Sequence, residues 1–354
     1  MNVKNIFIEG REIGDDQPPY IIAEMSANHN GSIENAKRII FEAKRCGADA
    51  VKIQTYTADT ITLNSSKPDF QITGGLWDGQ SLHELYSQAS LPWEWHEELF
   101  DYAREQSITI FSSPFDKTAV DLLEKLNAPA YKIASFEAID LPLIRYVAQT
   151  KKPMIISTGM ANQIEIEEAI EAARSGGCQK LVILHCVSGY PAVPEDYNLR
   201  TLAHMKQYFK VHVGLSDHTI SNTTALASIA LGGCLIEKHF TLNRQNGGPD
   251  DSFSLEPDDL RNLCKDSRDA FYSLGRVNYD LKGQEKDNSQ FRRSLYTCAN
   301  IKKGEPFSLE NIRSVRPGFG MPPKYLDQIV GKIAAQDIDF ATALQKDMIK
   351  DLDF

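Results

Sequence analysis

Short apolar runs that end in polar residues alternate with longer amphipathic segments along most of the chain. The runs are typical of buried strands, and the segments between them carry apolar residues at the spacing of one helix face. The predicted strands are Tyr20–Ala27, Ala50–Tyr56, Ile108–Phe115, Ala130–Ser135, Pro153–Thr158, Lys180–Val187 and two stretches that begin at Val211 and Leu235. The predicted helices are Ile33–Cys46, Trp93–Gln106, Lys117–Asn127, Leu141–Gln149, Ile164–Ser175, Leu199–Phe209, Asn222–Gly233 and Pro257–Leu274.

The alternation of strands and helices predicts the fold class. Eight strand–helix units over about 250 residues are typical of an α/β protein with a (β/α)8 TIM barrel, here expected within residues 1–278. The alternative is a doubly wound open sheet, which normally has fewer units and a glycine-rich dinucleotide fingerprint after its first strand. No such fingerprint follows Tyr20–Ala27, so the barrel is favoured.

Four segments do not follow the alternation of strands and helices. Asn2–Arg11 alternates weakly and predicts a short strand or hairpin before the barrel. Thr57–Ser90 is long and glycine-rich and contains Trp77, which favours a functional lid or wall. Tyr279–Gln290 is polar and is interpreted as a linker. Phe291–Phe354 is interpreted as a separate small domain that needs to dock on a barrel, because so short a segment is marginally stable alone.

Composition narrows the class of protein. Hydrophobic residues make up 42% and charged residues 24% of the chain, which is typical of a globular protein. The net charge of −10 and the pI of about 5.4 argue against a nucleic acid or an anionic membrane as partner. No apolar run reaches the roughly 20 residues of a membrane span, and no signal peptide is recognisable. Six scattered cysteines without a CxxC pair indicate reduced thiols, and hence a cytoplasmic protein.

Two histidines stand at the ends of consecutive predicted strands, in Val213–Thr219 and Leu235–Thr241. A helix separates the two strands, so they should be parallel neighbours with both histidines at the same sheet edge. Strand side chains alternate, so Glu237 lies on the face of His239. Two imidazoles beside a carboxylate predict a divalent-metal site with open positions. The alternative is that His218 and His239 are hydrogen-bonded core histidines.

The other strand ends carry a mixture of cations, hydroxyls and carboxylates. In a barrel these ends meet at one mouth, where the active site lies. Lysines and serines together predict an anion site, and Glu24 and Glu137 are candidate acid–base carboxylates. With a metal beside them, this chemistry suggests formation or cleavage of a carbon–carbon bond between a phosphorylated compound and a carbonyl compound. The polar strand-end residues are Glu24, Lys52, Gln54, Ser112, Ser113, Lys132, Ser135, Glu137, Ser157, Ser188, Tyr190, Ser216, His218, Glu237 and His239.

These residues occur in motifs whose ordered set resembles the sialic acid (nonulosonate) synthase family over nearly the whole chain. The resemblance includes an antifreeze-like (SAF) domain at the C-terminus. The motifs are Glu24 with Asn28–Gly31, Lys52–Gln54, Ser112–Phe115, Tyr131–Ser135 with Glu137, Ser157–Met160, Gly214–Thr219, Glu237–Thr241 and Arg316–Gly318. Further stretches resemble one branch of the family more than the branch that makes N-acetylneuraminate, namely Gln54–Thr62, Gly75–Gly79, Trp93–Trp95, Ser135–Glu137 and Gly247–Asp250.

The resemblance implies condensation of phosphoenolpyruvate with an open-chain amino sugar, with release of phosphate by C–O cleavage. It implies that Glu137 handles the proton of the attacking water, and that His218 and His239 bind manganese or magnesium. The implied phosphoenolpyruvate ligands are Lys52, Ser113, Lys132, Ser135, Ser157, Ser188 and Ser216. The implied sugar ligands are Glu24, Gln54, Tyr190, Asp250 and Arg316, the last from the partner subunit of a domain-swapped homodimer.

One residue departs from the family pattern. The neuraminate enzymes have asparagine where this chain has Ser188, although a hydroxyl can still donate a hydrogen bond.

Three alternative interpretations of the function stay open. The first is the same chemistry on another amino sugar. The second is a carbohydrate- or ice-binding C-terminal domain on an inert barrel, and the third is a lyase that forms a Schiff base through Lys132.

Overall fold

The computed structural model describes residues 3–75 and 77–352. The chain divides into two compact units, residues 1–275 and 276–354, and each is described by itself. Among the described residues, no helix is both long enough and apolar enough to cross a membrane.

The first unit contains a closed barrel of eight parallel strands in its described residues, which confirms the predicted fold class. The sheet closes between its first and last strands, where Glu24 lies beside His239 in register. This closure brings the two ends of the predicted series together at the mouth. In barrel order the strands are β10 (Leu235–His239), β3 (Tyr20–Glu24), β4 (Ala50–Thr55), β5 (Thr109–Pro114), β6 (Tyr131–Ile133), β7 (Met154–Ser157), β8 (Leu181–Cys186) and β9 (His212–Asp217).

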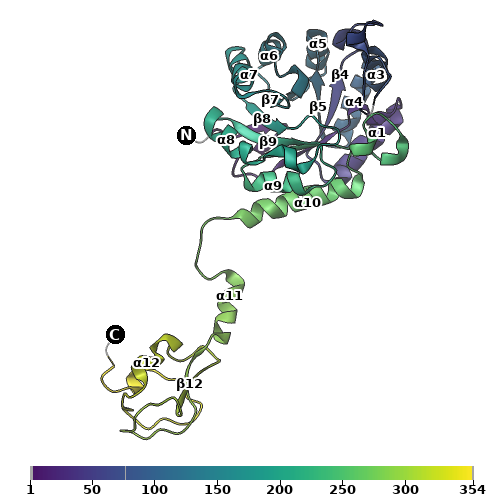
Figure 1. The fold of residues 1–354 in the computed structure, drawn as a ribbon. Coiled ribbons are helices and arrows are strands. Elements are labelled where there is room, and N and C mark those ends of the chain that lie inside the picture. Colours follow the sequence, from purple (N-terminus) through teal and green to yellow (C-terminus); the bar gives the residue numbers. More distant parts are fainter. Residues whose placement is uncertain (1–2, 76, 353–354) are drawn as a thin grey trace. The chain divides into compact units, whose positions relative to one another are not determined.

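Helices pack around the strands as an outer layer (Figure 1). Their ends lie where capping residues predict them: the Ser32 hydroxyl accepts from Asn35 N–H at the start of the first helix, and Gly47, at φ 92°, ends it in the left-handed region. The helices that follow the strands are α1 (Ile33–Cys46), α4 (His96–Glu105), α5 (Lys117–Lys125), α6 (Leu141–Ala148), α7 (Gln163–Ser175), α8 (Arg200–Phe209), α9 (Thr223–Ala230) and α10 (Pro257–Leu274).

The amino-terminal segment forms a hairpin, one of the two arrangements expected for it. Strands β1 (Ile6–Ile8) and β2 (Arg11–Ile13) pair antiparallel. Ile6, Ile8 and Ile13 are buried together with Tyr20, Val182 and other residues from the inside of the barrel. Since Tyr20 begins its strand, the hairpin closes the amino-terminal end of the barrel and leaves the opposite end for chemistry.

The long segment between β4 and α4 is not a plain loop. It contains α2 (Ala58–Ile61), a 3-10 turn (Pro68–Phe70) and α3 (Leu82–Ala89). A capping box begins α3, because the Ser81 hydroxyl accepts from Glu84 N–H and the Glu84 carboxylate accepts from Ser81 N–H. The glycines around Trp77 therefore form a turn between helices.

The second unit has its own small core of residues such as Leu295, Phe307 and Ile329. Strands β11 (Ser294–Thr297) and β12 (Ile312–Val315) pair antiparallel, and α12 spans Leu326–Ile329. The polar stretch interpreted as a linker contains a helix, α11 (Gly283–Asn288). Its first turn is stabilised by the Glu285 carboxylate, which accepts from Lys282 N–H.

Candidate active site

Two buried lysines and two buried carboxylates meet at the mouth of the barrel. Lys52 lies 2.8 Å from Glu24 and 3.6 Å from Glu237, measured between the ammonium nitrogen and the nearest carboxylate oxygen. Lys132 lies 3.5 Å from Glu237. All four residues are at most 5% exposed. Alternation along β3, β4, β6 and β10 places them on the inner face, as the sequence predicts.

The two lysines differ in how well their charges are compensated. Burial alone would lower the pKa of Lys52, but Glu237 and Glu24 raise it above the ordinary value. Burial lowers the pKa of Lys132, and Glu237 opposes this effect only in part. Burial raises the pKa of Glu24, whereas Lys132 and Lys52 lower that of Glu237 although burial opposes them. Lys132 is therefore the cation that a bound anion would stabilise most.

Glu237 is the residue whose importance sequence reasoning missed. It was expected beside His239, yet it bridges Lys52 and Lys132, and its Oε1 accepts from the Ser216 hydroxyl at 3.5 Å. Its Oε2 is buried without a hydrogen-bond partner in the described chain. Strand alternation placed Glu237 on the inner face, but the distances to the lysines depend on barrel closure.

Hydroxyl groups complete this part of the mouth. Ser113 accepts from Lys52 at 3.2 Å. The Ser157 and Ser188 hydroxyls are buried and have no hydrogen-bond partner among the described residues. Ser135 accepts from Gly159 N–H at 3.1 Å. Buried polar atoms are normally hydrogen-bonded, so the unpartnered hydroxyls beside two lysines are suited to donate to the oxygens of an anion.

Gly159 leaves room for the hydroxyl groups of Ser135 and Ser188, which together with that of Ser157 we call the serine cradle. A Cβ atom at residue 159 would lie 2.2 Å from the Ser188 hydroxyl oxygen and 2.8 Å from the Ser135 hydroxyl oxygen. Only glycine leaves room for both hydroxyls around its N–H group. The Ser157–Met160 motif thus contributes a backbone donor as well as the Ser157 side chain.

Glu137 stands beside the cradle, in a 3-10 turn after β6. Its side chain is partly buried, and its Oε2 has no hydrogen-bond partner in the described residues. Burial raises the pKa of Glu137 to about 7, and the nearby Lys132 reduces the rise. A carboxyl group that titrates near neutral pH is suited to accept and return a proton.

His218 and His239 come together as the strand pattern predicts, with ring centroids 5.4 Å apart. His218 Nδ1 lies 2.7 Å from Val187 O. A carbonyl oxygen only accepts, so Nδ1 carries a proton, and in the neutral imidazole Nε2 keeps a free lone pair. Burial lowers the pKa of His218, but Cys186 and the Val187 carbonyl raise it above the ordinary value. His239 Nδ1 is buried without a hydrogen-bond partner in the described chain, 3.8 Å from an Asp250 oxygen. Within the described residues, no group of three or more histidine, cysteine or carboxylate side chains could hold a metal ion.

The barrel residues expected to contact a sugar lie on the same side of the mouth. Gln54 donates to Glu24 at 2.9 Å, and the Tyr190 ring lies 4.4 Å from the His218 ring, centroid to centroid. Asp250 accepts from Ala27 N–H at 3.5 Å. The expected sugar ligand Arg316 is exposed and belongs to the second unit, which is described by itself.

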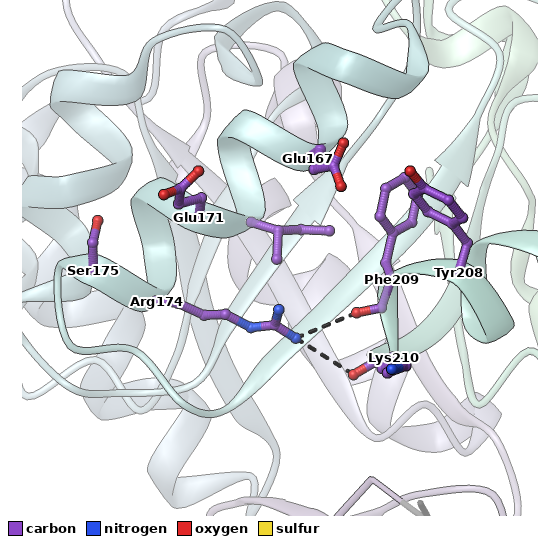
Figure 2. Close-up of a pocket in the computed structure, with 8 residues that line it drawn as sticks. Glu167, Glu171, Arg174, Ser175, Tyr208, Phe209 and Lys210 are labelled. Carbon is purple, nitrogen blue, oxygen red and sulfur yellow. Dashed lines mark hydrogen bonds between the residues drawn. The ribbon is translucent and has the colours of Figure 1, made fainter.

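A surface pocket shown in Figure 2 is a different feature. Residues of α7 and α8 line it, and Arg174 donates to the carbonyl oxygens of Phe209 and Lys210 at 3.3 and 3.4 Å. These carbonyls lie at the carboxyl end of α8, which leads into the amino-terminal end of β9. The pocket is therefore on the opposite edge of the barrel from the lysines and histidines, and we do not assign the chemistry to it.

A barrel whose mouth holds buried lysines, unpartnered hydroxyls and a carboxyl group with a raised pKa has the features of an enzyme site for an anionic substrate. Residues 39–279 match the NeuB family, and residues 292–350 match the SAF domain. The chain belongs to the NeuB family, which confirms the resemblance seen in the motifs.

Individual relatives cover almost the entire chain. It is 46% identical over 331 residues to a pseudaminic acid synthase of Campylobacter jejuni strain 81-176, covering 94% of this chain and 96% of that protein. It is 42% identical over 335 residues to a pseudaminic acid synthase of Helicobacter pylori strain 26695, covering 94% and 98%. The crystal structure of an N-acetylneuraminic acid synthetase from Leptospira borgpetersenii, with citrate bound, is 27% identical, with a TM-score of 0.72 over 81% of this chain and 95% of that chain.

Proposed function

We propose that this chain condenses phosphoenolpyruvate with 2,4-diacetamido-2,4,6-trideoxy-L-altrose and water to form pseudaminic acid and inorganic phosphate. The product would supply a bacterial surface or flagellar glycan. The observation that carries the proposal is the joint presence of two buried lysines, unpartnered hydroxyls and a histidine pair in the barrel mouth. The identities of 46% and 42% to pseudaminic acid synthases support the choice of sugar.

Phosphoenolpyruvate would bind between the lysines and the serine cradle. Lys132 has the less compensated charge, so an anionic group beside it restores the balance. The hydroxyls of Ser157 and Ser188 can donate to phosphate oxygens. The Gly159 N–H, which donates to the Ser135 hydroxyl, would orient that hydroxyl toward the same anion. Ser113, Ser135 and Ser216 complete the set of expected ligands, and the Ser216 hydroxyl would turn from Glu237 to the phosphate.

The reaction forms one carbon–carbon bond and breaks one carbon–oxygen bond. The methylene carbon of phosphoenolpyruvate attacks the aldehyde carbon of the sugar, and water adds to the central carbon of phosphoenolpyruvate. The bond between that carbon and the phosphate oxygen then breaks as the new hydroxyl group loses its proton to become the ketone, and the former aldehyde oxygen takes up a proton to become a hydroxyl group. Glu137 would take the proton of the attacking water, because its pKa of about 7 leaves a sufficient fraction ionised.

The histidine pair fits a divalent ion, manganese or magnesium. The imidazoles of His218 and His239 lie close together, Nε2 of the neutral His218 ring has a free lone pair, and His239 Nδ1 is buried without a partner in the described chain. Burial lowers the pKa of His239, which favours the neutral imidazole that a metal requires. When bound, such an ion polarises the sugar aldehyde. With two histidine ligands, positions stay open for substrate and water.

The sugar would lie against Glu24, Gln54, Tyr190 and Asp250, and Arg316 of a second copy would complete its site in a domain-swapped homodimer. The Arg316 side chain is exposed. Its turn is stabilised by Ser294, whose hydroxyl donates to Pro317 O at 2.7 Å and accepts from Gly320 N–H at 2.9 Å. A guanidinium fork is well suited to amide carbonyls of the sugar.

The unpaired state of all six cysteines supports a cytoplasmic enzyme.

A phosphate-release assay with purified protein tests the proposal. The substrates are phosphoenolpyruvate, a divalent cation and a panel of sugars that contains the L-altrose derivative, its gluco and manno isomers and N-acetylmannosamine. We expect the L-altrose derivative to give the highest kcat/KM. A higher value for another sugar would instead indicate an N-acetylneuraminate or legionaminate synthase with the same chemistry.

A further inference from the structure

A tight turn between the 3-10 helix Pro68–Phe70 and α3 has no assigned role in the reaction. Its ends are joined by two backbone hydrogen bonds, from Ile72 N–H to Gln80 O at 2.9 Å and from Gly79 N–H to Ile72 O at 3.1 Å. The Asp78 carboxylate accepts from Gly74 N–H at 2.6 Å. These bonds connect the two arms of the turn on either side of Trp77.

The turn reaches the mouth of the barrel through Trp77. The indole ring of Trp77 lies 6.3 Å from the ring of Tyr190, centroid to centroid. Tyr190 in turn contacts His218, at 4.4 Å, and Phe253, at 5.3 Å. The Tyr190 ring therefore connects Trp77 to His218, and Trp77 lies on the side of the mouth expected to hold the sugar.

Two polar atoms of this turn are buried without partners in the part of the chain that the structure describes. They are the indole nitrogen Nε1 of Trp77 and the amide oxygen Oε1 of Gln80. Trp93 is the matched case, because its Nε1 donates to Tyr56 O at 3.2 Å. Buried donors and acceptors are rarely left unpaired, so each exception indicates a missing ligand group or water. The turn offers one donor and one acceptor, three residues apart.

We infer that Trp77 and Gln80 form a subsite for the 4-acetamido group of the sugar. An acetamido group has one carbonyl acceptor and one N–H donor, which match the Trp77 donor and the Gln80 acceptor. The indole ring also provides an apolar surface for the acetyl methyl group. The inference rests on the proposed function, since it concerns the same sugar. It assigns recognition of the second amide to a turn outside the barrel strands.

The experiment compares two enzymes on two sugars. One sugar is 2,4-diacetamido-2,4,6-trideoxy-L-altrose, and the other carries a hydroxyl in place of the 4-acetamido group. The wild type should prefer the diacetamido sugar. Trp77→Phe keeps an aromatic ring but removes the donor, so the ratio of the two kcat/KM values should fall about tenfold. Gln80→Met should lower the same ratio. The KM for phosphoenolpyruvate should stay unchanged in both variants.

Trp93→Phe is the control, because it removes an indole donor that already has a protein acceptor. Its ratio should equal that of the wild type. A Trp77→Phe enzyme that folds and retains the wild-type ratio would overturn the inference, as would an equal loss with both sugars. Failure of the proposed function has a different signature: the wild type would release phosphate with neither sugar, and the inference would fall with it.

Discussion

Lys238 and Asp217 form a buried ion pair on the outer face of the barrel, with 2.7 Å between Nζ and Oδ2. Each is the sequence neighbour of one member of the histidine pair, His239 and His218. Lys238 also donates to Thr219 O at 2.7 Å, in the loop after His218. The pair joins β9 to β10 behind the site, which explains why the lysine and aspartate occur within the two histidine motifs.

We therefore expect Lys238→Met to destabilise the protein strongly at neutral pH. The substitution leaves Asp217 charged, buried and unpaired, which costs about 3–5 kcal/mol. The double variant Lys238→Met, Asp217→Asn removes the isolated charge and should recover part of this loss. Urea unfolding of the wild type, of Lys238→Met, of Asp217→Asn and of the double variant measures the coupling energy between the two side chains. Additive effects would mean that the two side chains act independently.

The buried lysines should determine affinity for phosphoenolpyruvate. Charge-assisted hydrogen bonds contribute roughly 1.5–3 kcal/mol, so Lys132→Met should raise the KM for phosphoenolpyruvate about ten- to hundredfold. The KM for the sugar should change much less, and Lys52→Met should act in the same direction. The exposed Lys180→Met is the control and should leave both values unchanged. Equal increases for the two substrates would contradict the assignment.

Glu137 should affect turnover more than binding. Glu137→Gln should lower kcat by about 10²–10⁴-fold, as expected when a general acid–base group is removed. Burial raises its pKa to about 7, and the water-attack step requires the ionised form. The kcat/KM of the wild type should therefore rise with pH through about 7, and Glu137→Gln should lack this inflection. A rise in KM without loss of kcat would indicate that Glu137 only positions Lys132.

The histidine pair should be required for turnover but not for folding. His218→Ala and His239→Ala should abolish phosphate release while circular dichroism stays unchanged. A chelator should inactivate the wild type, and added Mn²⁺ or Mg²⁺ should restore it, because metal ligands without their ion leave the aldehyde unpolarised. Full activity in excess chelator would rule out the metal.

A mixing experiment tests the role of Arg316. Arg316→Ala and His218→Ala should each be inactive alone. In a mixed dimer, one mouth has its own His218 together with Arg316 of the other copy, so subunit exchange should restore part of the activity. Mass spectrometry of the mixture measures the exchange. Exchange without recovery would show that Arg316 does not act across the dimer.

The sequence by itself determined the elements, the barrel and most of the residues at its mouth. Strand and helix periodicities are local, and so are caps such as Ser32 and Gly47, which is why the element bounds could be predicted closely. Alternation along a strand also determined that Lys52 and Gln54 share the inner face. The segment around Trp77 was predicted less well, because its short helices depend on individual capping contacts.

Only the tertiary structure decided how these residues pair. Glu237 lies far along the chain from Lys52 and Lys132, and the closure of β10 against β3 sets their separations. The pairing of β3 with β4 places Glu24 directly beside Lys52, and Lys132 is left with the weaker compensation. The approach of Trp77 to Tyr190 likewise depends on how a long connection folds back over the mouth. Local patterns determine which face a side chain occupies, whereas the distance between residues from different strands follows from barrel closure and register.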